Sequence, residues 1–240
     1  MPRVLVGELM DDPTLDPAEH AHALRGLARL NAMSRAPSVL YPILRREAAR
    51  LDRPLTIVDI ATGSADVPVA LLERASRDGV RFDITACDIS RVALEHARDR
   101  ARSANVTLAA HQLDILNEDA PQADVLVCSL FLHHLTDEQV RLVLGKMAAA
   151  AHRMVLISDL RRGPWGTTLA AVIPRLVTRS HVVHVDGLRS ARAALSIGEA
   201  RAMARGIAEG KGWTVARAFP ARMLIRWSRD DGSKDGTTRS

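Results

Sequence analysis

Five short apolar runs separated by helix-length stretches constrain the fold of this chain more than any other feature. Four of them are mostly apolar and not alternating, which is typical of strands buried on both faces. Such strand–helix alternation predicts a doubly wound α/β domain whose mostly parallel sheet is covered by helices on both faces. The runs are LTIVDI (55–60), FDITACD (82–88), VTLAAHQLD (106–114), DVLVCSL (124–130) and MVLISDL (154–160).

Helical patterns precede the first run. Asp16, Pro17 and Glu19 supply a cap, a first-turn proline and an acid at the third position, so we expect a helix to begin there. A break around 34–37 leads to a second expected helix over 40–51, with Pro42 near its start.

The alternation of predicted strands and helices ends after residue 165. A helical segment is followed by an expected loop from His181 to Gly187, and then Ser196 and Glu199 cap a helix that ends near 210–212. The runs WTVARAF (213–219) and RMLIRW (222–227) alternate and predict an antiparallel hairpin at a sheet edge.

These patterns divide the chain into parts. We expect an N-terminal helical cap or lid over 1–53 and a Rossmann-like α/β domain over 54–227. That domain would carry a substrate-cap insertion near 161–195, and a disordered polar tail would follow over 228–240.

Cysteines and hydropathy indicate the compartment. Cys87 and Cys128 cannot form a disulfide framework and suit a reducing environment. The chain shows neither an export signal nor 18 uninterrupted apolar residues, so we expect a cytoplasmic protein without a membrane span.

The basic residues are unevenly distributed. The formal net charge is +5, but 161–226 carry 12 basic residues against three acids, whereas 54–160 carry 10 basic and 15 acidic residues. The basic half fits an anionic small substrate, an acidic carrier protein, contact with a membrane surface, or simply a solvated arginine-rich face. Nucleic acid is disfavoured because aromatics are only 3% of the chain and do not alternate with basic residues.

The turn after the first run, VDIATGSAD (58–66), is rich in small residues and opens a helix, as in ligand-binding loops. It does not meet the dinucleotide pattern G-x-G-x-x-G, because the third position falls on Asp66. A carboxylate there repels a diphosphate, which disfavours NAD and FAD and favours a ligand with cationic groups.

Acids also end the next two runs. Asp88 lies 25 residues after Gly63, where a carboxylate can accept hydrogen bonds from both hydroxyls of a ribose. Asp114 ends the third run, where an acceptor can read an exocyclic amine. Acids on consecutive strand ends predict an adenosine pocket.

These motifs give the chain a family resemblance. VDIATGSADVP (58–68), TACDIS (85–90), HQLDIL (111–116), DVLVCSLFLHHL (124–135) and VLISDLRR (155–162) resemble class I S-adenosylmethionine (SAM)-dependent methyltransferases. Within that superfamily the chain is similar to the ubiquinone/menaquinone-biosynthesis-like small-molecule enzymes. The resemblance covers 15–227 as architecture and 55–160 as motifs. It implies a seven-stranded sheet of order 3-2-1-4-5-7-6, with the last inserted strand antiparallel.

The resemblance also implies a cofactor site for SAM, with S-adenosylhomocysteine as product. One departure is Ala65, where the family usually has glycine. By the resemblance, Asp59, Ala61, Gly63 and Ala65 would line the methionine part of SAM, and Asp88 with Ile89 would hold the ribose and adenine. Asp114 and Ile115 would flank the adenine, and Ser129 would lie beneath the sulfonium. Arg35 would close over the cofactor as part of a lid.

Histidines follow the fourth run at the edge where ligands bind. We expect His133 or His134 to face the methyl group as a base or aligning residue; the alternative is that both only fix the loop. No metal is expected, because His181 and His184 have no second pair of ligands beside them. Candidate substrate contacts are Arg161, Trp165, His181 and His184.

The predicted function is metal-independent O- or C-methylation of a small aromatic, quinone-like or polyketide-derived molecule, which a carrier or a membrane surface can present. The alternatives are a non-catalytic SAM-binding regulator or partner subunit, and a nucleic-acid methyltransferase. The latter is disfavoured because SLFLHH (129–134) replaces the Pro-Pro pair usual in enzymes that methylate nucleobase or glutamine amines. The sequence does not indicate an oligomeric state.

Overall fold

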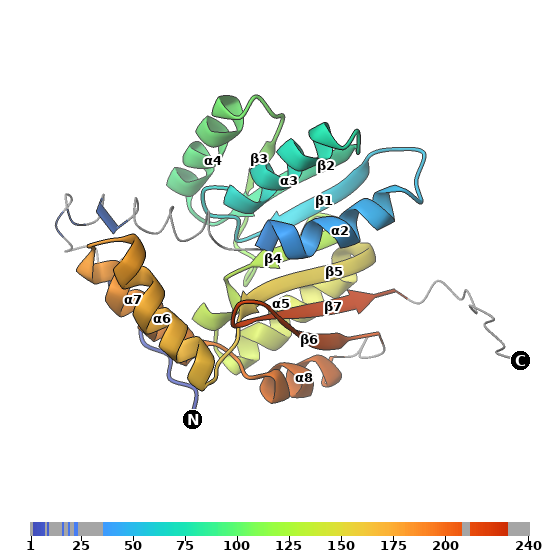
Figure 1. Ribbon diagram of the computed structural model, residues 1–240. Helices are drawn as coiled ribbons and strands as arrows, with labels where there is room; N and C mark the ends of the chain where they lie inside the picture. Colours follow the sequence, from blue (N-terminus) through green and yellow to red (C-terminus); the bar gives the residue numbers. More distant parts are fainter. Residues whose placement is uncertain are drawn as a thin grey trace, which may run out of the picture.

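The computed structural model describes residues 2–7, 9, 16, 19, 22–23, 36–207 and 212–229. Its centre is one seven-stranded sheet of order β3-β2-β1-β4-β5-β7-β6 (Figure 1). The strands are β1 (Leu55–Ile60), β2 (Phe82–Asp88), β3 (Ala109–Gln112), β4 (Ala123–Ser129), β5 (Ala151–Leu160), β6 (Thr214–Ala218) and β7 (Arg222–Ser228). The predicted fold class and strand order are confirmed.

Helices separate the strands along the chain. They are α2 (Ala36–Ala48), α3 (Asp66–Arg77), α4 (Arg91–Ser103), the short 3₁₀ helix η2 (Leu132–His134), α5 (Asp137–Ala150), α6 (Pro164–Val177), α7 (His181–Ala193) and α8 (Ile197–Arg205). The predicted cap of Ser196 with Glu199 is present as a capping box at the start of α8, and a second capping box, Thr136 with Gln139, begins α5.

Helices cover both faces of the sheet. Because neighbouring residues of a strand point to opposite sides, successive side chains are buried against different helices. In β1, Ile57 packs into a cluster with residues of α2 and α3. Val58 and Ile60 belong to a second cluster, which includes residues of α5 and α8. This double burial explains why the central strands read as continuous apolar runs.

The C-terminal hairpin forms as predicted, but its position differs in one respect. β7 pairs antiparallel with β5, and β6 pairs antiparallel with β7. Of the two hairpin strands, β6 therefore forms one edge of the sheet, and β7 is an inner strand with Met223, Ile225 and Trp227 buried.

Three local predictions are wrong. The expected loop from His181 to Gly187 belongs to α7, whose cap is the hydroxyl of Ser180. Pro42 lies inside α2 and not near its start, because that helix already begins at Ala36. The third strand is shorter than 106–114 because the Asp114 carboxylate accepts a hydrogen bond from the amide of Leu116 and turns the chain.

The N-terminal helix prediction lies mostly outside the described residues. The expected cap contact is present, since the carboxylate of Asp16 accepts a hydrogen bond from the Glu19 amide at 3.1 Å. The expected tail also lies outside them beyond residue 229.

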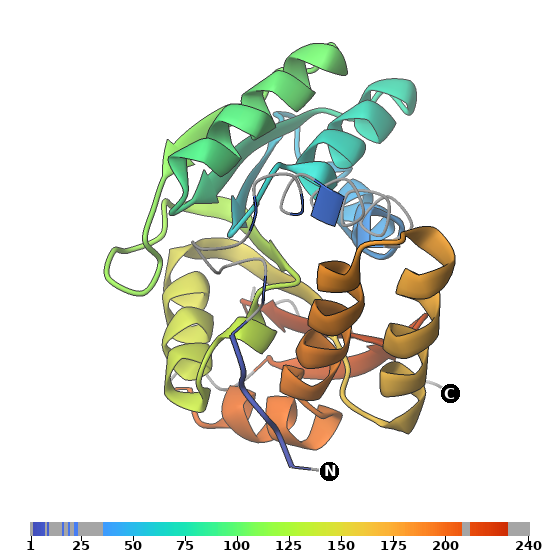
Figure 2. The same ribbon diagram turned by 90° about the vertical axis from the view of Figure 1, so that its left-hand side faces the viewer.

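Helices α6 and α7 pack side by side at the sheet edge where the parallel strands end (Figures 1 and 2). This places them over the region expected to bind ligands in an open α/β sheet. Among the described residues, no helix is long and apolar enough to cross a membrane.

Gly166 in the first turn of α6 has no room for a side chain. A Cβ built there would lie 2.6 Å from the backbone oxygen of Arg161. We expect Gly166→Ala to lower the free energy of unfolding by about 1–3 kcal/mol, because backbone must move. Gly145→Ala in α5 is the control, since its Cβ would meet only Ile207 at 4.0 Å. Denaturant unfolding of both variants measures the difference; equal stability would contradict the expectation.

Candidate functional site

The loop between β1 and α3 is held in an unusual backbone conformation. Ala61, Gly63 and Ala65 all have positive φ, at 54°, 56° and 57°. For alanine this conformation costs on the order of 1–2 kcal/mol, and Ala65 is fully buried. Leu130, directly after β4, also has a φ of 57°. Strain at two neighbouring strand ends is typical of a binding site.

Asp88 at the end of β2 organises this loop. Its carboxylate accepts hydrogen bonds from the amide of Gly63 at 2.8 Å and from the amide of Ser90 at 2.9 Å. The glycine turn and the end of β2 therefore meet, as the parallel arrangement of β1 and β2 requires.

Three side-chain oxygens near this edge are buried without a hydrogen-bond partner among the described residues. One is Oγ of Ser158 on β5, which lies in register with Ser129. The two on the adjacent strands β1 and β4 are Oδ1 of Asp59 and Oγ of Ser129. Burial, offset in part by the Thr62 hydrogen bond and reinforced by the nearby Asp88, raises the pKa of Asp59 to about 7. Unpartnered buried acceptors are costly, so these two atoms indicate a ligand with donor or cationic groups.

Asp114, Ile89 and Ile115 surround the neighbouring strand ends. The side chain of Ile89 is 60% exposed, whereas Ile115 is packed into the core. The Asp114 carboxylate accepts hydrogen bonds from the Asn117 side chain at 2.8 Å and from the Leu116 amide, and the Asn117 bond first of all lowers its pKa. An exposed apolar side chain beside an acid suits the edge and face of a flat heterocycle.

His133 is the buried histidine of the pair after β4. It is 5% exposed, and its Nδ1 lies 2.7 Å from Oδ1 of Asp159 at the end of β5. Asp159 also accepts hydrogen bonds from the amides of Leu132 and Leu160, each at 2.6 Å. The carboxylate thus fixes both the ring and the turn that carries it.

The charge of Asp159 is maintained by its surroundings. Burial alone would raise the pKa of this carboxyl, but His133, the Leu160 amide and the nearby Arg222 together hold the pKa below its usual value. Asp159 therefore remains a carboxylate that favours a proton on Nδ1 of His133, which leaves Nε2 as the basic nitrogen. This is the arrangement of a histidine base with an orienting acid.

His134 occupies a different environment. It is exposed, and its ring centre lies 4.2 Å from that of His133. The structure therefore supports His133 more strongly than His134 as the aligned histidine.

Sequence reasoning missed Asp159 and Arg222. Asp159 is the one acid in the run MVLISDL and lies at its carboxyl end. An acid at the end of a predicted parallel strand could have identified it as a site residue. Arg222 begins β7 beside Leu160, and its buried Nη1 has no hydrogen-bond partner among the residues that the structure describes.

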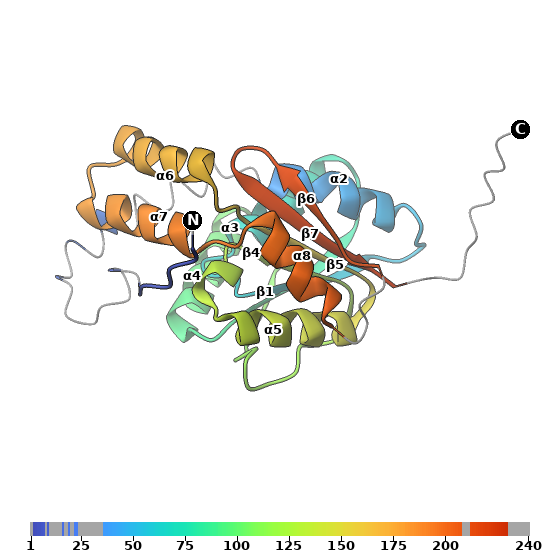
Figure 3. The ribbon, with the colours of Figure 1, turned by 90° about the horizontal axis from the view of Figure 1, so that it is seen from below.

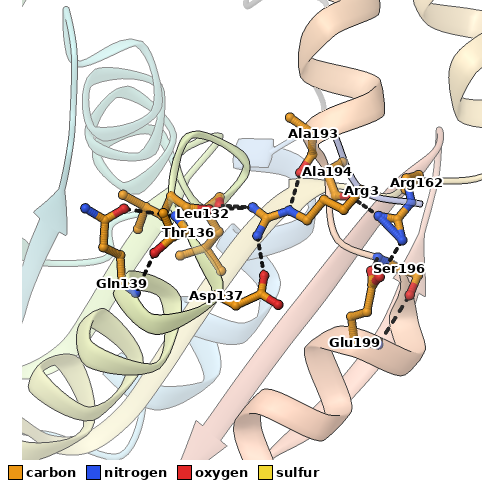
Figure 4. A network of polar contacts seen from close by, with 11 residues as sticks. Arg3, Leu132, Thr136, Asp137, Gln139, Arg162, Ala193, Ala194, Ser196 and Glu199 are labelled. Carbon is orange, nitrogen blue, oxygen red and sulfur yellow. Dashed lines mark hydrogen bonds and ion pairs between the residues drawn. The ribbon is translucent and has the colours of Figure 1, made fainter. Parts of the chain in front are cut away.

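Arg3 connects the turn that carries His133 and His134 to the end of α7 (Figure 4). Its guanidinium donates to the carbonyls of Leu132 and Leu135 at 3.1 and 2.7 Å, on either side of the two histidines. It also donates to Ala193 at the end of α7 at 2.6 Å and to Asp137 at 2.7 Å. The turn that carries His133 is thus tied to α7 through the N-terminal segment.

The segment after Arg3 follows α7. Arg189 donates to the carbonyl of Gly7 at 2.7 Å, and the amide of Leu9 donates to Asp186 at 2.7 Å. A second link joins α8 to the end of β5, where Arg162 pairs with Glu199 (Figure 4).

The predicted substrate residues do not form one cluster. His181 is exposed, and Nε2 of His184 contacts the carbonyl of Thr178 at 2.8 Å, which closes the turn between α6 and α7. Trp165 is 65% exposed, and Nε of Arg161 is buried without a hydrogen-bond partner in the described part of the chain. Their substrate roles stay predictions, and Arg35 lies outside the described residues.

Asp66 needs a different interpretation from the one its position suggested. Its carboxylate forms an ion pair with Arg100 of α4 at 2.8 Å, so its charge is already balanced within the protein. The preference for a cationic ligand therefore depends on Asp59 and not on Asp66. Among the described residues, no group of three histidine, cysteine or acidic side chains is placed to hold a metal ion.

Comparison with known proteins agrees with this geometry. Residues 57–153 match the family model described as a methyltransferase domain. A release factor glutamine methyltransferase from Streptococcus pneumoniae is 31% identical over 77 residues. That alignment covers 32% of this chain and 26% of the relative, so the chain matches about a quarter of that protein.

Solved structures resemble nearly the whole chain. Magnesium protoporphyrin IX methyltransferase from Synechocystis PCC 6803, solved with bound SAM, has a TM-score of 0.55 at 13% identity and covers 92% of this chain and 88% of its own. The plantazolicin methyltransferase BamL has a TM-score of 0.65 at 14% identity, covering 88% of this chain and 90% of its own. The fold is that of class I methyltransferases, as the sequence motifs predicted, and the match to a methyltransferase domain agrees with it.

Proposed function

We propose that this chain, whose residues 57–153 match a methyltransferase domain within a class I fold, transfers a methyl group from SAM to a small acceptor molecule. The observation that carries the proposal is the pair of unpartnered buried oxygens, Asp59 Oδ1 and Ser129 Oγ, beside the strained glycine turn. Bound SAM would supply an electrophilic methyl group on a sulfonium.

The residues at the strand ends fit SAM. Asp59 offers a buried carboxylate to the ammonium and sulfonium charges of the methionine part. Asp88 offers a carboxylate to the ribose hydroxyls, with the glycine turn at Gly63 beside it. Ile89 offers an exposed apolar surface to adenine, and the oxygen of Ser129 would lie beneath the sulfonium.

Methyl transfer is an in-line displacement, so the protein contributes chiefly by positioning. Holding the acceptor atom in line at near-attack distance can lower the activation free energy by about 7–11 kcal/mol. When the acceptor is a hydroxyl or an acidic carbon, Nε2 of His133 takes its proton, and Asp159 stabilises the resulting imidazolium through Nδ1. Helices α6 and α7 exclude water from the reacting atoms.

The acceptor we propose is aromatic, quinone-like or polyketide-derived, with O- or C-methylation that needs no metal. The apolar composition of α6 beside the strand ends and the net positive charge of 161–226 support such a substrate. Proteins of this fold include one named for magnesium protoporphyrin IX and one solved with apigenin, which are planar molecules. A cytoplasmic location stays a prediction from the sequence.

Binding of SAM should be coupled to the ionisation of Asp59. Because its pKa is about 7, the carboxyl is mostly neutral at pH 6 and charged at pH 8. We expect SAM affinity to rise with pH up to about 7, by at most about tenfold per pH unit, with release of a proton at pH 6. Calorimetry in two buffers of different ionisation enthalpy measures this proton. An Asp59→Asn variant that releases it equally would contradict the assignment.

The experiment that tests the function has two steps. SAM at a hundred times its dissociation constant should stabilise the protein by about 2.7 kcal/mol, which a thermal shift detects. Radiolabelled SAM with a panel of phenols, quinols and naphthols should then give a methylated product. Absence of SAM binding would refute the proposal, and binding without transfer to any acceptor would favour a non-catalytic SAM-binding protein.

A further inference from the structure

Helix α6 exposes one apolar face. Trp165, Leu169, Val172 and Leu176 recur at spacings of four, three and four residues, which places them on one side of the helix. We refer to these four residues as the α6 apolar stripe. Trp165 is 65%, Val172 47% and Leu176 80% exposed, and only Gly166 and Pro174 of this helix are buried.

A second exposed aromatic extends this surface. Phe219, in the turn between β6 and β7, is 71% exposed. That turn lies against the start of α6, because a Cβ on Gly166 would be 3.7 Å from the Cβ of Ala221. α6 and the turn lie on the same side of the molecule in Figures 1 and 3. Contiguous exposed apolar side chains of this size typically mark an interaction surface.

Among the described residues, the charged side chains beside the stripe in sequence are arginines. Arg175 within α6 and Arg179 after it are exposed, and so is Arg217 before the Phe219 turn. Residues 161–185 and 212–229 contain no aspartate or glutamate. The next acid along the chain, Asp186, is 5% exposed and therefore does not offset this positive surface.

An exposed apolar face bordered by arginines distinguishes between two possible binding partners, a second copy of the chain and an anionic bilayer. A second copy of the chain would bring the same exposed arginines against one another, which costs free energy. An apolar helix face with tryptophan at one end and arginines at its border is the composition of helices that lie in the interface of an anionic bilayer. Tryptophan favours the level of the lipid headgroups, and each nearby arginine is attracted by anionic lipid.

We propose that the α6 apolar stripe and the Phe219 turn dock onto an anionic lipid surface. α6 then lies in the headgroup region with its stripe toward the acyl chains, while α7 stays on the protein side. Lipid docking itself does not depend on the proposed function. Only its purpose rests on that function: an apolar acceptor would reach the strand ends directly from the bilayer.

Vesicle binding by the full chain tests the proposal without SAM or acceptor. We expect the protein to sediment with phosphatidylcholine vesicles that contain phosphatidylglycerol and to remain in solution with pure phosphatidylcholine. Trp165 should shift its emission to shorter wavelength on binding, and Trp165→Phe should abolish the shift, because Trp227 is 4% exposed and Trp213 partly buried.

Matched variants identify the surface. Val172→Ser with Leu176→Ser should weaken vesicle binding at least about tenfold, because both side chains lose apolar area. Arg175→Gln or Arg179→Gln should each weaken it about fivefold. Leu142→Ser is the control, since this leucine is 44% exposed on α5, on the opposite side of the molecule (Figure 3).

The proposal is overturned if the protein ignores anionic vesicles, or if Leu142→Ser weakens binding as much as the stripe variants do. It is also overturned if light scattering shows a dimer that the Leu176 substitution dissociates, because the stripe would then contact a second copy. Calorimetry with SAM separates this result from failure of the proposed function.

Discussion

An Asp88→Ala variant is expected to bind SAM about 10²- to 10⁴-fold more weakly than the unmodified protein. The ribose hydroxyls would lose two charge-assisted hydrogen bonds, each contributing about 1.5–3 kcal/mol. The Gly63 amide would also lose its acceptor, which frees the glycine turn. Isothermal titration calorimetry with SAM measures the change directly.

Two further variants make this result specific. Asp88→Asn retains one acceptor oxygen without the charge and should show an intermediate loss. Asp83→Ala removes an exposed acid from the same strand, β2, and should leave SAM affinity unchanged. An Asp88→Ala protein that is folded by circular dichroism and binds SAM normally would refute the adenosine pocket.

A His133→Ala variant is expected to lower the rate of methyl transfer about 10²- to 10⁴-fold, the usual contribution of a positioned base. Asp159→Asn should reduce the rate as well, because it removes the charge that favours the proton on Nδ1 of His133. SAM affinity should stay within about twofold in both variants, because the hydrogen bonds of these two side chains join β5 to the turn after β4, whereas the ends of β1 and β2 would hold the nucleoside. Single-turnover assays with saturating SAM measure the chemical step.

The control for the histidine variants is His152→Ala, which removes an exposed histidine from β5 far from its carboxyl end. Stability must be measured alongside the rate, because the Asp159 carboxylate also binds the Leu132 amide. A folded His133→Ala protein with an undiminished rate would leave this histidine only a structural role. Equal rates for the His134→Ala variant and the unmodified protein would assign the proton transfer to His133 alone.

Much of the fold could be predicted because burial decided it. β1 and β2 were delimited residue for residue, since strands covered on both faces read as mostly apolar runs without strict alternation. The pairing of β1 with β2 then brings Gly63 and Asp88 together, although they are 25 residues apart. Their proximity could be inferred from the rule that parallel strands end at one edge.

Other features could not be predicted because they depend on contacts between distant segments. Asp159 meets His133 only through the register of β4 and β5, which aligns Ser129 with Ser158. α7 reads as a loop locally, yet it is helical where Gly187 lies against Pro174 of α6. Local propensity carries no information on such tertiary contacts.

The four hydrogen bonds of Arg3 have a practical consequence for anyone who prepares this protein. An affinity tag joined immediately before residue 2, or a protease that trims the first few residues, acts on the chain within reach of the turn that carries His133 and His134. Under the proposed role of His133, a preparation altered in that way would transfer methyl groups slowly even if every strand-end carboxylate were intact. Purification handles are better attached after residue 229, because β7 is antiparallel to β5 and ends at the opposite end of the strands from His133.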